Sequence, residues 1–304
     1  THLGDPKDYG FQHGVETSEF DDRKTFENAK NIIRDTNFGA TPFFFWLSPR
    51  QPHVPLKPTG EWLDLYDAAS LPAEPNFLTR PPYVNNYKDL PAGPPRSIEQ
   101  IKDFTKAYYA TISHLDFQIG EIINELKKKS LLNNTVIIFL SDNGYFLGNH
   151  GLGNKLTMYE ESVKGPMFIS WPRLKDKNTR CKGPASSVDI FPTILDLAGI
   201  KIPDHLQGNT LKPVFLNHSY QAHQYVVSES VGVGGALGTG HRMVVADGWK
   251  YILSDIGEEA LYDLQADTYE LKNIFSDASH RDRIRRMKDY LADWKKLTGD
   301  KKNL

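Results

Sequence analysis

The sequence predicts an α/β fold in which helices cover a mixed, mostly parallel sheet. Two observations lead to this prediction. Apolar runs of strand length alternate with amphipathic stretches as far as Leu216, an order that is typical of layered α/β domains. Beyond Leu216 the pattern changes to short, closely spaced apolar segments separated by Gly- and Asp-rich turns, which favours an antiparallel sheet. We therefore expect a main α/β domain over residues 1–216 and a small C-terminal α+β subdomain over 217–304.

Strands and helices alternate in the expected main domain. Phe43–Leu47 is apolar throughout, as a strand covered on both faces of a sheet is. Apolar residues then recur every three or four positions over 97–129, which predicts a long helix that begins at a capping box of Ser97 and Gln100. Further along the chain we expect strands over 135–140 and 167–170 and a helix over 188–197.

The expected subdomain is an antiparallel sheet closed by a helix. Its candidate strands are the short apolar segments 225–228, 243–245, 250–253 and 261–264. The segment 281–297 is amphipathic at helical spacing, so it is expected to form the last helix of the chain.

The composition excludes several classes of protein. With 304 residues, 39% hydrophobic and 24% charged, the chain has the composition of a folded globular protein. Its net charge of −2 gives no overall basic field for nucleic acid. No apolar run reaches the ~20 residues that a membrane span needs. The single cysteine, Cys181, rules out an intrachain disulfide and a multi-cysteine zinc site.

Polar residues directly follow the strand expected over 135–140. Ser141-Asp142-Asn143-Gly144 places a carboxylate and an amide oxygen at the carboxyl end of that strand, the edge at which open α/β sheets bind ligands. Such oxygen donors suit Ca²⁺ or Mg²⁺, although two donors do not complete a site. Taken alone, the tetrapeptide is also consistent with an Asx turn that closes the strand.

Two loops carry further ionisable side chains. His53 lies between two prolines, and such a stiff segment can fix an imidazole as a proton donor or anion ligand. His150 and Lys155 lie in a Gly-rich loop ahead of an expected helix, where a lysine can neutralise a bound oxyanion. Taken alone, a loop histidine such as His53 is more often a surface residue, and Lys155 is equally consistent with an exposed, solvated lysine.

Together these segments resemble the signature regions of the type I sulfatases, a family of the alkaline phosphatase superfamily. The stretch from Asp142 through Lys155 to Ser162 resembles the family's metal-binding and second-signature region. The segment 42–58 is similar to its PFF…PHxPxxxP element, and 1–4 is similar to the end of its GK-x-HLG motif. The segment 261–274 resembles its LYDLxxDPxExxNL ending. Each piece is short, but their order and spacing cover essentially the whole chain.

The resemblance implies an alkaline-phosphatase-like α/β sandwich that hydrolyses sulfate esters at a formylglycine nucleophile beside Ca²⁺, with Mg²⁺ as the alternative metal. Transferred position by position, Asp142 and Asn143 are metal ligands. His2 contacts the hydroxyl of the nucleophile and helps to expel sulfate after the transfer step.

The same resemblance assigns the substrate contacts. His53 donates a proton to the leaving alcohol oxygen, and Lys155 binds a sulfate oxygen. His150 and His241 are further candidates for contact with the substrate. This division of roles suits the chemistry, because a sulfate ester needs positive charge on its non-bridging oxygens and protonation of the leaving alkoxide.

The nucleophile that the family uses is absent from this chain. It lies in a C-x-P-S-R motif or its serine version, and neither occurs here, since Cys181 stands in an unrelated context. The resemblance places the nucleophile and the paired aspartates that complete the metal site upstream of Thr1. We therefore expect the N-terminal portion of the same sulfatase to be a partner of this chain, and the chain alone to be inactive.

The expected function is a sulfuric ester hydrolase that removes sulfate from a sulfated saccharide. Two alternatives stay open: a phosphonate monoester or phosphodiester hydrolase of the same superfamily, and a non-catalytic saccharide-binding module if the gene begins at Thr1. Resemblance to exported sulfatases, and two glycosylation sequons at Asn133 and Asn217, suggest a periplasmic, secreted or lysosomal location.

A proline-rich loop is the expected wall of the substrate pocket. Ten of the 19 prolines fall between Pro52 and Pro95, which excludes regular structure over much of this tract. The aromatic side chains of Trp62, Tyr83 and Tyr87 offer stacking faces for a saccharide, or else they pack the loop onto the domain.

Overall fold

The computed structural model describes residues 6–15, 17, 22–79, 97–155, 157–172, 174, 179–181, 183–217, 219–230 and 240–301. The described residues form two compact units. The first unit takes them from within 1–73, 96–137 and 170–172, and the second from within 74–95, 138–169 and 173–304. The domain boundary expected at residue 216 stays a prediction.

Seven α-helices are assigned in the described part of the chain. They are α1 (Arg23–Asp35), α2 (Gly60–Leu63), α3 (Ile98–Lys128), α4 (Glu160–Val163), α5 (Ile190–Leu197), α6 (Lys212–Leu216) and α7 (Arg281–Thr298). The strands in the same residues are β1 (Ile137–Leu140), β2 (Phe146–Leu147), β3 (Gly153–Asn154), β4 (Met167–Ser170), β5 (Val226–Ser230), β6 (His241–Ala246), β7 (Trp249–Ser254) and β8 (Glu259–Asp263). The predicted helices over 97–129, 188–197 and 281–297 are confirmed.

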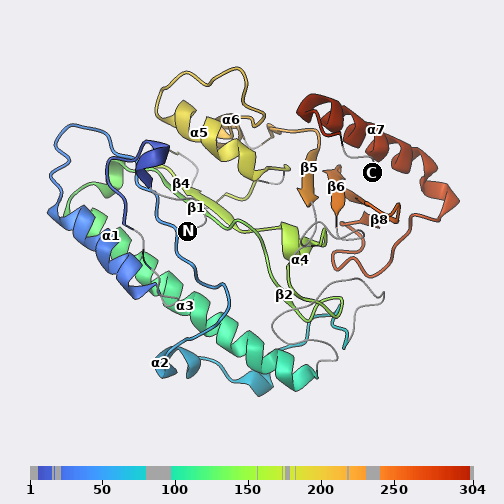
Figure 1. Ribbon diagram of the computed structural model, residues 1–304, viewed down its shortest axis with the longest axis horizontal. Coiled ribbons are helices and arrows are strands. Elements are labelled where there is room, and N and C mark those ends of the chain that lie inside the picture. The colour runs from blue at the N-terminus through green and yellow to red at the C-terminus, as the bar shows by residue number, and fades with distance from the viewer. Residues whose placement is uncertain are drawn as a thin grey trace. The chain divides into compact units, whose positions relative to one another are not determined.

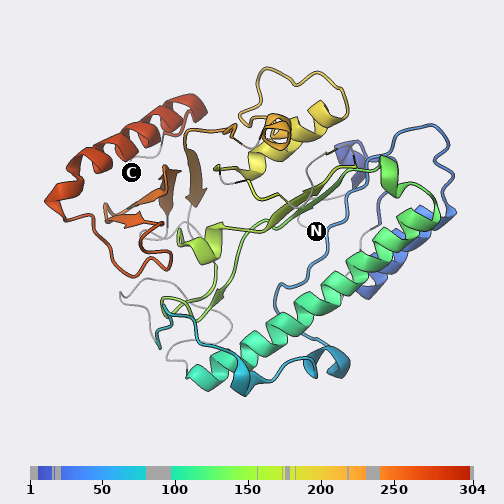
Figure 2. The same cartoon turned by 180° about the vertical axis from the view of Figure 1, so that it is seen from behind.

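In the first unit, α1 lies along the long helix α3, as Figures 1 and 2 show from opposite sides. The buried stripe of α1 consists of Phe26, Ala29 and Ile33, which are spaced three and four residues apart. The capping box predicted at the start of α3 is present, because the Gln100 N–H donates to Ser97 Oγ and the Ser97 N–H donates to Gln100 Oε1.

The segment Phe43–Leu47 corrects one prediction. It is extended but forms no strand in the described structure, and Phe44 and Trp46 are 55% and 65% exposed. A β-strand is defined by hydrogen bonds to a neighbour, and no described strand pairs with this segment. The expectation of a strand buried on both faces is therefore wrong for the described residues.

The second unit contains the antiparallel sheet predicted for the C-terminal region, with the order β5-β6-β7-β8. Helix α7 packs on β6 and β7, as Figure 1 shows. Their shared core is fully buried and includes Val244, Tyr251, Leu261 and Met287. This sheet and its helix consist of short strands joined by tight turns and of one amphipathic segment. Both features are visible in the local sequence, so the pattern predicted the C-terminal region well.

Two smaller strand pairs lie in the middle of the chain, where the polar signature residues are. The strands predicted over 135–140 and 167–170 correspond to β1 and β4, which pair with each other. The Ser141 N–H donates to Pro166 O at 3.1 Å, so the end of β1 lies beside the start of β4. Strands β2 and β3 form an antiparallel hairpin.

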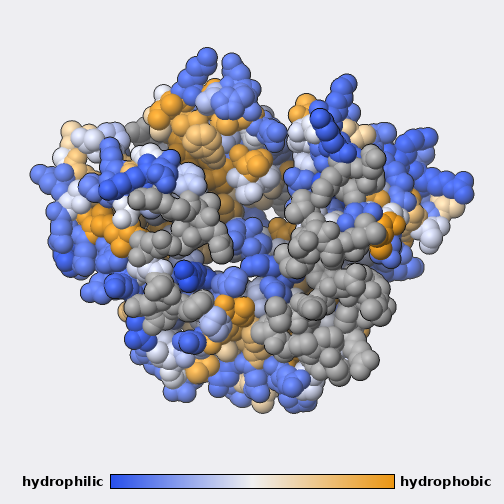
Figure 3. Space-filling view, in the orientation of Figure 1, coloured by the Kyte–Doolittle hydropathy of each residue, from blue (hydrophilic) through white to orange (hydrophobic). Residues whose placement is uncertain are grey.

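Apolar side chains are exposed around α5 in the second unit. Val188, Phe191 and Ile200 are each more than half exposed, and Figure 3 shows hydrophobic side chains gathered over this helix.

Among the described residues, no helix combines the length and the apolar character that crossing a bilayer requires.

Candidate active site

The turn after β1 presents the predicted metal ligands. Asp142 is exposed and Asn143 is half-buried. The Ser141 hydroxyl donates to Asn143 O at 2.6 Å, and the Gly144 N–H donates to Ser162 O at 2.8 Å. A Cβ atom on Gly144 would lie 2.1 Å from the Glu161 carbonyl oxygen, so only glycine fits this close approach to α4.

The β2–β3 hairpin brings Lys155 toward this turn. Phe146 pairs with Asn154, and continuing that antiparallel register by one position places Lys155 opposite Tyr145, two residues after Asn143. The Thr157 hydroxyl, two residues beyond Lys155, is buried without a hydrogen-bond partner among the described residues. Such an atom is costly unless something else satisfies it, so this segment suits a polar ligand.

Asp142 and Asn143 carry the oxygen donors that a hard cation prefers, but these two residues are too few to complete its coordination. The Asp142 carboxylate takes part in no hydrogen bond or ion pair with another described residue, and carboxylate and amide oxygens are the donors that Ca²⁺ and Mg²⁺ prefer. No cluster of three or more His, Cys, Asp or Glu side chains suited to a metal occurs among the described residues. Asp142 and Asn143 can therefore supply only part of the six or more ligands that Ca²⁺ takes.

His53 lies in the first unit and is exposed. Its backbone N–H donates to Arg50 O at 2.8 Å, and its ring Nδ1 lies 2.7 Å from Val54 O. A carbonyl oxygen can only accept, so Nδ1 carries a proton and Nε2 faces away from this bond. The peptide bonds Gln51–Pro52 and Val54–Pro55 on either side are cis.

The remaining predicted residues have different outcomes. His2 lies outside the described residues. His241 lies in β6, paired with Ser230 of β5 and Ser254 of β7, and its role in substrate contact stays a prediction. Of the proposed stacking faces, Trp62 lies in α2 and stacks on His114 of α3 with ring centroids 5.4 Å apart, so it packs α2 against α3. Tyr83 and Tyr87 lie outside the described residues.

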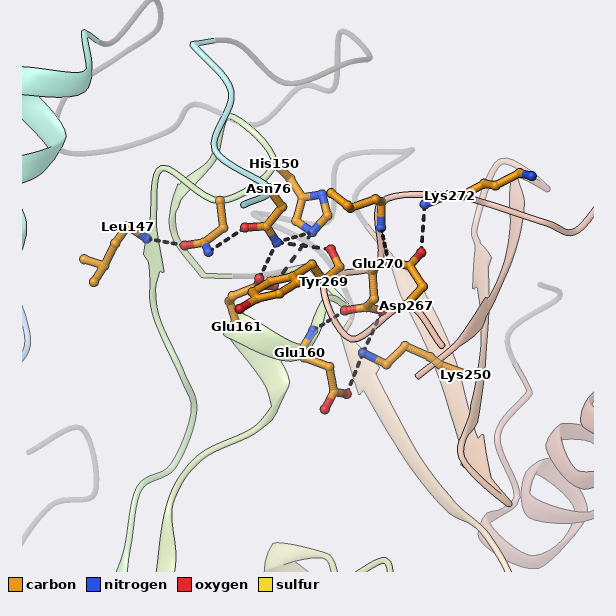
Figure 4. A network of polar contacts seen from close by, with 12 residues as sticks. Asn76, Leu147, His150, Glu160, Glu161, Lys250, Asp267, Tyr269, Glu270 and Lys272 are labelled. Carbon is orange, nitrogen blue, oxygen red and sulfur yellow. Dashed lines mark hydrogen bonds and ion pairs between the residues drawn. The ribbon is translucent and has the colours of Figure 1, made fainter. Parts of the chain in front are cut away.

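His150 belongs to a buried polar network in the second unit, which Figure 4 shows. Its ring stacks on Tyr159 with centroids 3.8 Å apart, and its Nε2 lies 3.1 Å from Asn76 Nδ2. The backbone N–H of His150 donates to the backbone carbonyl oxygen of Asn76 at 2.7 Å. Asn76 Nδ2 also donates to Glu161 Oε1 at 2.6 Å, so the network joins three separate segments of the chain.

Burial sets the charge of His150. Because the ring is buried, the pKa of His150 is lowered from its ordinary value; the Glu161 carboxylate opposes this shift and the Lys250 ammonium adds to it. The imidazole is therefore neutral at neutral pH.

A second cluster of charges lies beside this network, at the start of α4. Lys250 is completely buried, and its Nζ lies 2.7 Å from Glu160 Oε1 and 3.0 Å from Glu270 Oε1. Glu270 Oε2 also accepts the Glu160 N–H at 2.7 Å. Burial raises the pKa of Glu270 to about 7 although Lys250 is close. Burial alone would raise the pKa of Glu160. The Lys250 ammonium has the larger, opposite effect, so the pKa of Glu160 is lowered from its ordinary value.

Asn76, Lys250 and Glu270 were not predicted from the sequence as part of the site. Asn76 is separated from His150 by 74 residues, and Lys250 and Glu270 lie on or beyond β7. The family's ending motif contains Glu270, and this was the one signal that could have drawn attention to it.

Comparison with known proteins identifies the family. A family model described as Sulfatase matches residues 1–200, and one described as N-sulphoglucosamine sulphohydrolase, C-terminal, matches residues 148–297. The chain therefore belongs to the sulfatase family.

Curated relatives agree with this assignment. An arylsulfatase of Clostridium perfringens is 33% identical over 262 residues, which cover 83% of this chain and 52% of the relative. Arylsulfatase K of Canis lupus familiaris is 31% identical over 281 residues, which cover 83% of this chain and 52% of the relative. An N-acetylglucosamine-6-O-sulfatase of Bacteroides thetaiotaomicron is 31% identical over 210 residues, which cover 66% of this chain and 37% of the relative. The chain thus spans about half, or less, of the length of these relatives.

Solved structures confirm the fold class. An enzyme in complex with its substrate D-glucosamine-2-N,6-O-disulfate superposes with a TM-score of 0.80 and 23% identity, covering 95% of this chain and 72% of that one. The phosphonate monoester hydrolase of Silicibacter pomeroyi superposes with a TM-score of 0.75 and 21% identity, covering 91% and 61%. The chain has the alkaline-phosphatase-like α/β fold of sulfatases, as predicted.

Proposed function

We propose that the protein containing this chain hydrolyses sulfate esters of a saccharide. The observation that carries the proposal is the joining of the Asp142–Asn143 turn to the segment that bears Lys155. The β2–β3 hairpin and the bond from Gly144 to Ser162 make this connection. Metal ligands and an oxyanion-binding lysine are then held by one local structure, as charge stabilisation on a sulfate group requires.

In this proposal Asp142 and Asn143 hold part of a Ca²⁺ or Mg²⁺ site, and the cation, when bound, supplies positive charge against the sulfate oxygens. Lys155 adds a second positive charge to a non-bridging oxygen. Sulfate transfer moves negative charge onto the leaving oxygen and the non-bridging oxygens, so these fixed charges lower the barrier more than they favour the bound ester.

His53 is proposed as the proton donor to the leaving oxygen. Its Nδ1–H is held by Val54 O at 2.7 Å, which leaves Nε2 as the nitrogen that can carry a proton to the substrate. A saccharide hydroxyl is a poor leaving group unless it is protonated as the bond breaks, and a positioned acid typically contributes about 10²–10⁴-fold to such a step.

The nucleophile is proposed to come from another segment. By family resemblance it is a formylglycine, whose hydrated aldehyde supplies an activated hydroxyl, and His2 is the proposed contact for that hydroxyl. Two observations support a further segment of the same protein: the exposed apolar residues Phe44 and Trp46 stand on an extended stretch without a described partner strand, and the curated relatives are about twice as long as the matched region.

The proposed substrate is a sulfated amino sugar. The name of the Bacteroides relative and the ligand in the solved complex both point to sulfated glucosamine. His150 is proposed as one contact, since it is held in a rigid network, and His241 as another. The choice of sugar position and endo or exo action are left to substrate profiling.

A phosphonate monoester or phosphodiester hydrolase is the alternative that a specific observation favours. The Silicibacter pomeroyi enzyme shares this fold over most of the chain. Relative kcat/KM values on sulfate monoesters, phosphate diesters and phosphonate monoesters separate the two proposals.

We also propose that the protein is exported to the periplasm, the lysosome or the medium. Both sequon asparagines, Asn133 and Asn217, are exposed and therefore accessible to modification. Fractionation of the native host, with the protein detected by antibody, tests this location.

The function is tested with the longest natural form of the protein, expressed with a formylglycine-generating enzyme. Release of inorganic sulfate from glucosamine 6-O-sulfate and N-sulfate is measured, together with Lys155→Ala and a matched control, Lys164→Ala, whose side chain is mostly exposed. The proposal predicts turnover that Lys155→Ala removes and Lys164→Ala keeps. Absence of sulfate release from every ester tried would refute it.

A further inference from the structure

A buried carboxylate at the start of α1 reaches the loop that carries His53. Asp22 is 1% exposed, and its Oδ2 accepts the backbone N–H of Gln51 at 2.7 Å. The two residues are 29 positions apart in the sequence, and both belong to the first unit. A buried carboxylate is costly unless donors satisfy it, and hydrogen bonds to an ionised acceptor are stronger than neutral ones. This bond therefore ties the loop firmly to the beginning of the helix.

Asp22 does not act as an ordinary helix cap. It stands directly before the first residue of α1, where an aspartate side chain usually accepts an N–H of its own helix, but it makes no such bond. Its backbone has a φ of 56°, a left-handed conformation that is rare for residues other than glycine. Such conformations persist only where the surroundings fix them, and they are frequent at functional sites. The side chain thus serves the loop instead of its own helix.

Helix α1 gives Asp22 a firm base. The Phe26 N–H donates to Asp22 O at 2.9 Å, which is the first hydrogen bond of the helix. The side chains of Phe26, Ala29 and Ile33 are each 2% exposed, and α1 lies along α3, as Figure 1 shows. A group held by a packed helix is placed more exactly than one on a loop. Through Asp22, the loop gains a fixed point on this helix.

The anchored residue lies two positions before His53. Gln51 is inside a four-residue turn, which the His53 N–H closes by donating to Arg50 O at 2.8 Å. Gln51 is 7% exposed, whereas the His53 side chain is exposed and open to a substrate. The turn therefore has a buried corner, held by Asp22, and an exposed end that presents the imidazole. The bond between His53 Nδ1 and Val54 O, at 2.7 Å, then fixes the ring on this turn.

We infer that Asp22 is a positioning residue, which holds the turn 50–53 so that the His53 ring stays where it protonates the leaving oxygen. This inference rests on the proposed function, in which His53 is the proton donor. Asp22 is buried and acts only through His53. A general acid works only within hydrogen-bond reach of its acceptor, and a misplacement of about 1 Å can cost about 10²-fold in rate. Loss of the anchor therefore slows the ester whose leaving group needs a proton.

The inference is tested by kcat and KM of the longest natural form of the protein on a sulfated saccharide and on nitrophenyl sulfate. Asp22→Ala is expected to lower kcat on the saccharide about 10–100-fold, with KM nearly unchanged. The loss on nitrophenyl sulfate should be much smaller, because its leaving group needs little protonation. In a His53→Gln background, Asp22→Ala should cause no further loss on the saccharide. Equal losses on both esters, or a full additional loss in that background, would overturn the inference.

A matched control separates positioning from general stability. Asp189 is also completely buried, and its Oδ1 accepts the Asn209 N–H at 2.9 Å across 20 residues, but it belongs to the second unit. Asp189→Ala is expected to lower stability without any loss that depends on the leaving group. The same selective loss in this variant would contradict the role of Asp22.

A milder variant covers the case in which Asp22→Ala folds poorly. Asp22→Asn keeps the size of the side chain and an acceptor oxygen, but it forms only a neutral hydrogen bond, which is weaker. We expect a smaller loss of kcat that still falls mainly on the saccharide. A loss of equal size on both esters would again speak against positioning of the acid.

Amide hydrogen exchange tests the anchor without any turnover. Asp22→Ala is expected to speed exchange of the Gln51 amide about tenfold or more, the effect of losing one hydrogen bond to a charged group. Exchange in α3 should stay as in the native protein. An unchanged rate at Gln51 would overturn the inference. If the native protein releases no sulfate from any ester, the proposed function fails, while the exchange rate still decides whether Asp22 holds the turn.

Discussion

The Lys250 ammonium lies 3.0 Å from Glu270 Oε1 in the second unit, and both side chains are almost completely buried. The same ammonium also pairs with Glu160 at the first residue of α4. One buried cation therefore serves two carboxylates. Burial is the main reason why Glu270 holds its proton more tightly than a free glutamate does; the Glu160 carboxylate adds to this pKa shift and the Lys250 ammonium opposes it.

The first prediction concerns the dependence of stability on pH. The folded-state pKa of Glu270 is raised from 4.5 to about 7 by burial, so its contribution to stability is present below pH 4.5 and is lost as pH rises through about 7. Over this window the native chain is expected to lose up to about 3 kcal/mol relative to Glu270→Gln, which cannot titrate. Denaturant unfolding of both chains at pH 5 and pH 8 measures the difference.

The direction of this effect is the decisive part. The free energy of unfolding of the native chain minus that of Glu270→Gln must fall between pH 5 and pH 8. A constant or rising difference would show that Glu270 is already ionised in the folded chain at pH 5.

The second prediction is the cost of removing the buried cation. Lys250→Met leaves Glu160 and Glu270 without their shared partner, and loss of one member of a buried ion pair typically costs about 3–5 kcal/mol. Lys128→Met is the matched control, since Lys128 pairs with Glu125 at the same 2.7 Å but is 70% exposed. Thermal and denaturant unfolding are expected to show a large loss for the first and no measurable change for the second. Equal effects would contradict the role assigned to burial.

The third prediction concerns the turn that carries Asp142 and Asn143. In Gly144→Ala the new Cβ would lie 2.1 Å from the Glu161 carbonyl oxygen, so the turn must move away from α4. A loss of about 2–4 kcal/mol in unfolding free energy is expected, as for other severe core clashes. Binding of Ca²⁺ by the full-length protein, followed by calorimetry, should weaken in parallel.

Gly120→Ala provides the comparison for that change. A Cβ on Gly120 meets nothing within 4 Å, and the residue lies inside α3. Replacing an unconstrained helical glycine with alanine is expected to stabilise the chain by about 0.5–1 kcal/mol. Similar destabilisation by both substitutions would argue against the clash at Gly144.

The fourth prediction separates acid catalysis from binding at His53. His53→Gln is expected to reduce kcat on a sulfated saccharide by about 10²–10⁴-fold. The loss on nitrophenyl sulfate should be much smaller, because its leaving group needs little protonation. His13→Gln, an exposed histidine elsewhere in the first unit, is expected to have no effect on either ester. The same loss on both esters would exclude proton donation as the role of His53.

The sequence predicted elements whose cause is local. Helix α3 followed from its apolar repeat and the Ser97–Gln100 capping box, and strands β5 to β8 followed from short apolar runs between tight turns. Phe43–Leu47 was predicted wrongly, because a strand depends on a neighbour that local sequence does not contain.

The polar network was beyond sequence reasoning for a related reason. Asn76 and His150 are 74 residues apart, and nothing in the composition near Asn76 marks it as a partner of a histidine. Lys250 and Glu270 have the residue types of exposed surface charges, and only the tertiary structure, which brings both of them to Glu160 of α4, buries them. Asp142, His150 and Lys155 were singled out because strand ends and Gly-rich loops mark them, and their roles in a site stay predictions.

The most direct test of the account is the initial rate of inorganic sulfate release from a sulfated glucosamine by the longest natural form of the protein, before and after removal of divalent metal with a chelator. The account predicts release that is lost with the metal, is restored by Ca²⁺ or Mg²⁺, and is abolished in Asp142→Ala. Release that is unaffected in Asp142→Ala, or a strong preference for phosphate diesters or phosphonate monoesters over sulfate esters, would contradict it.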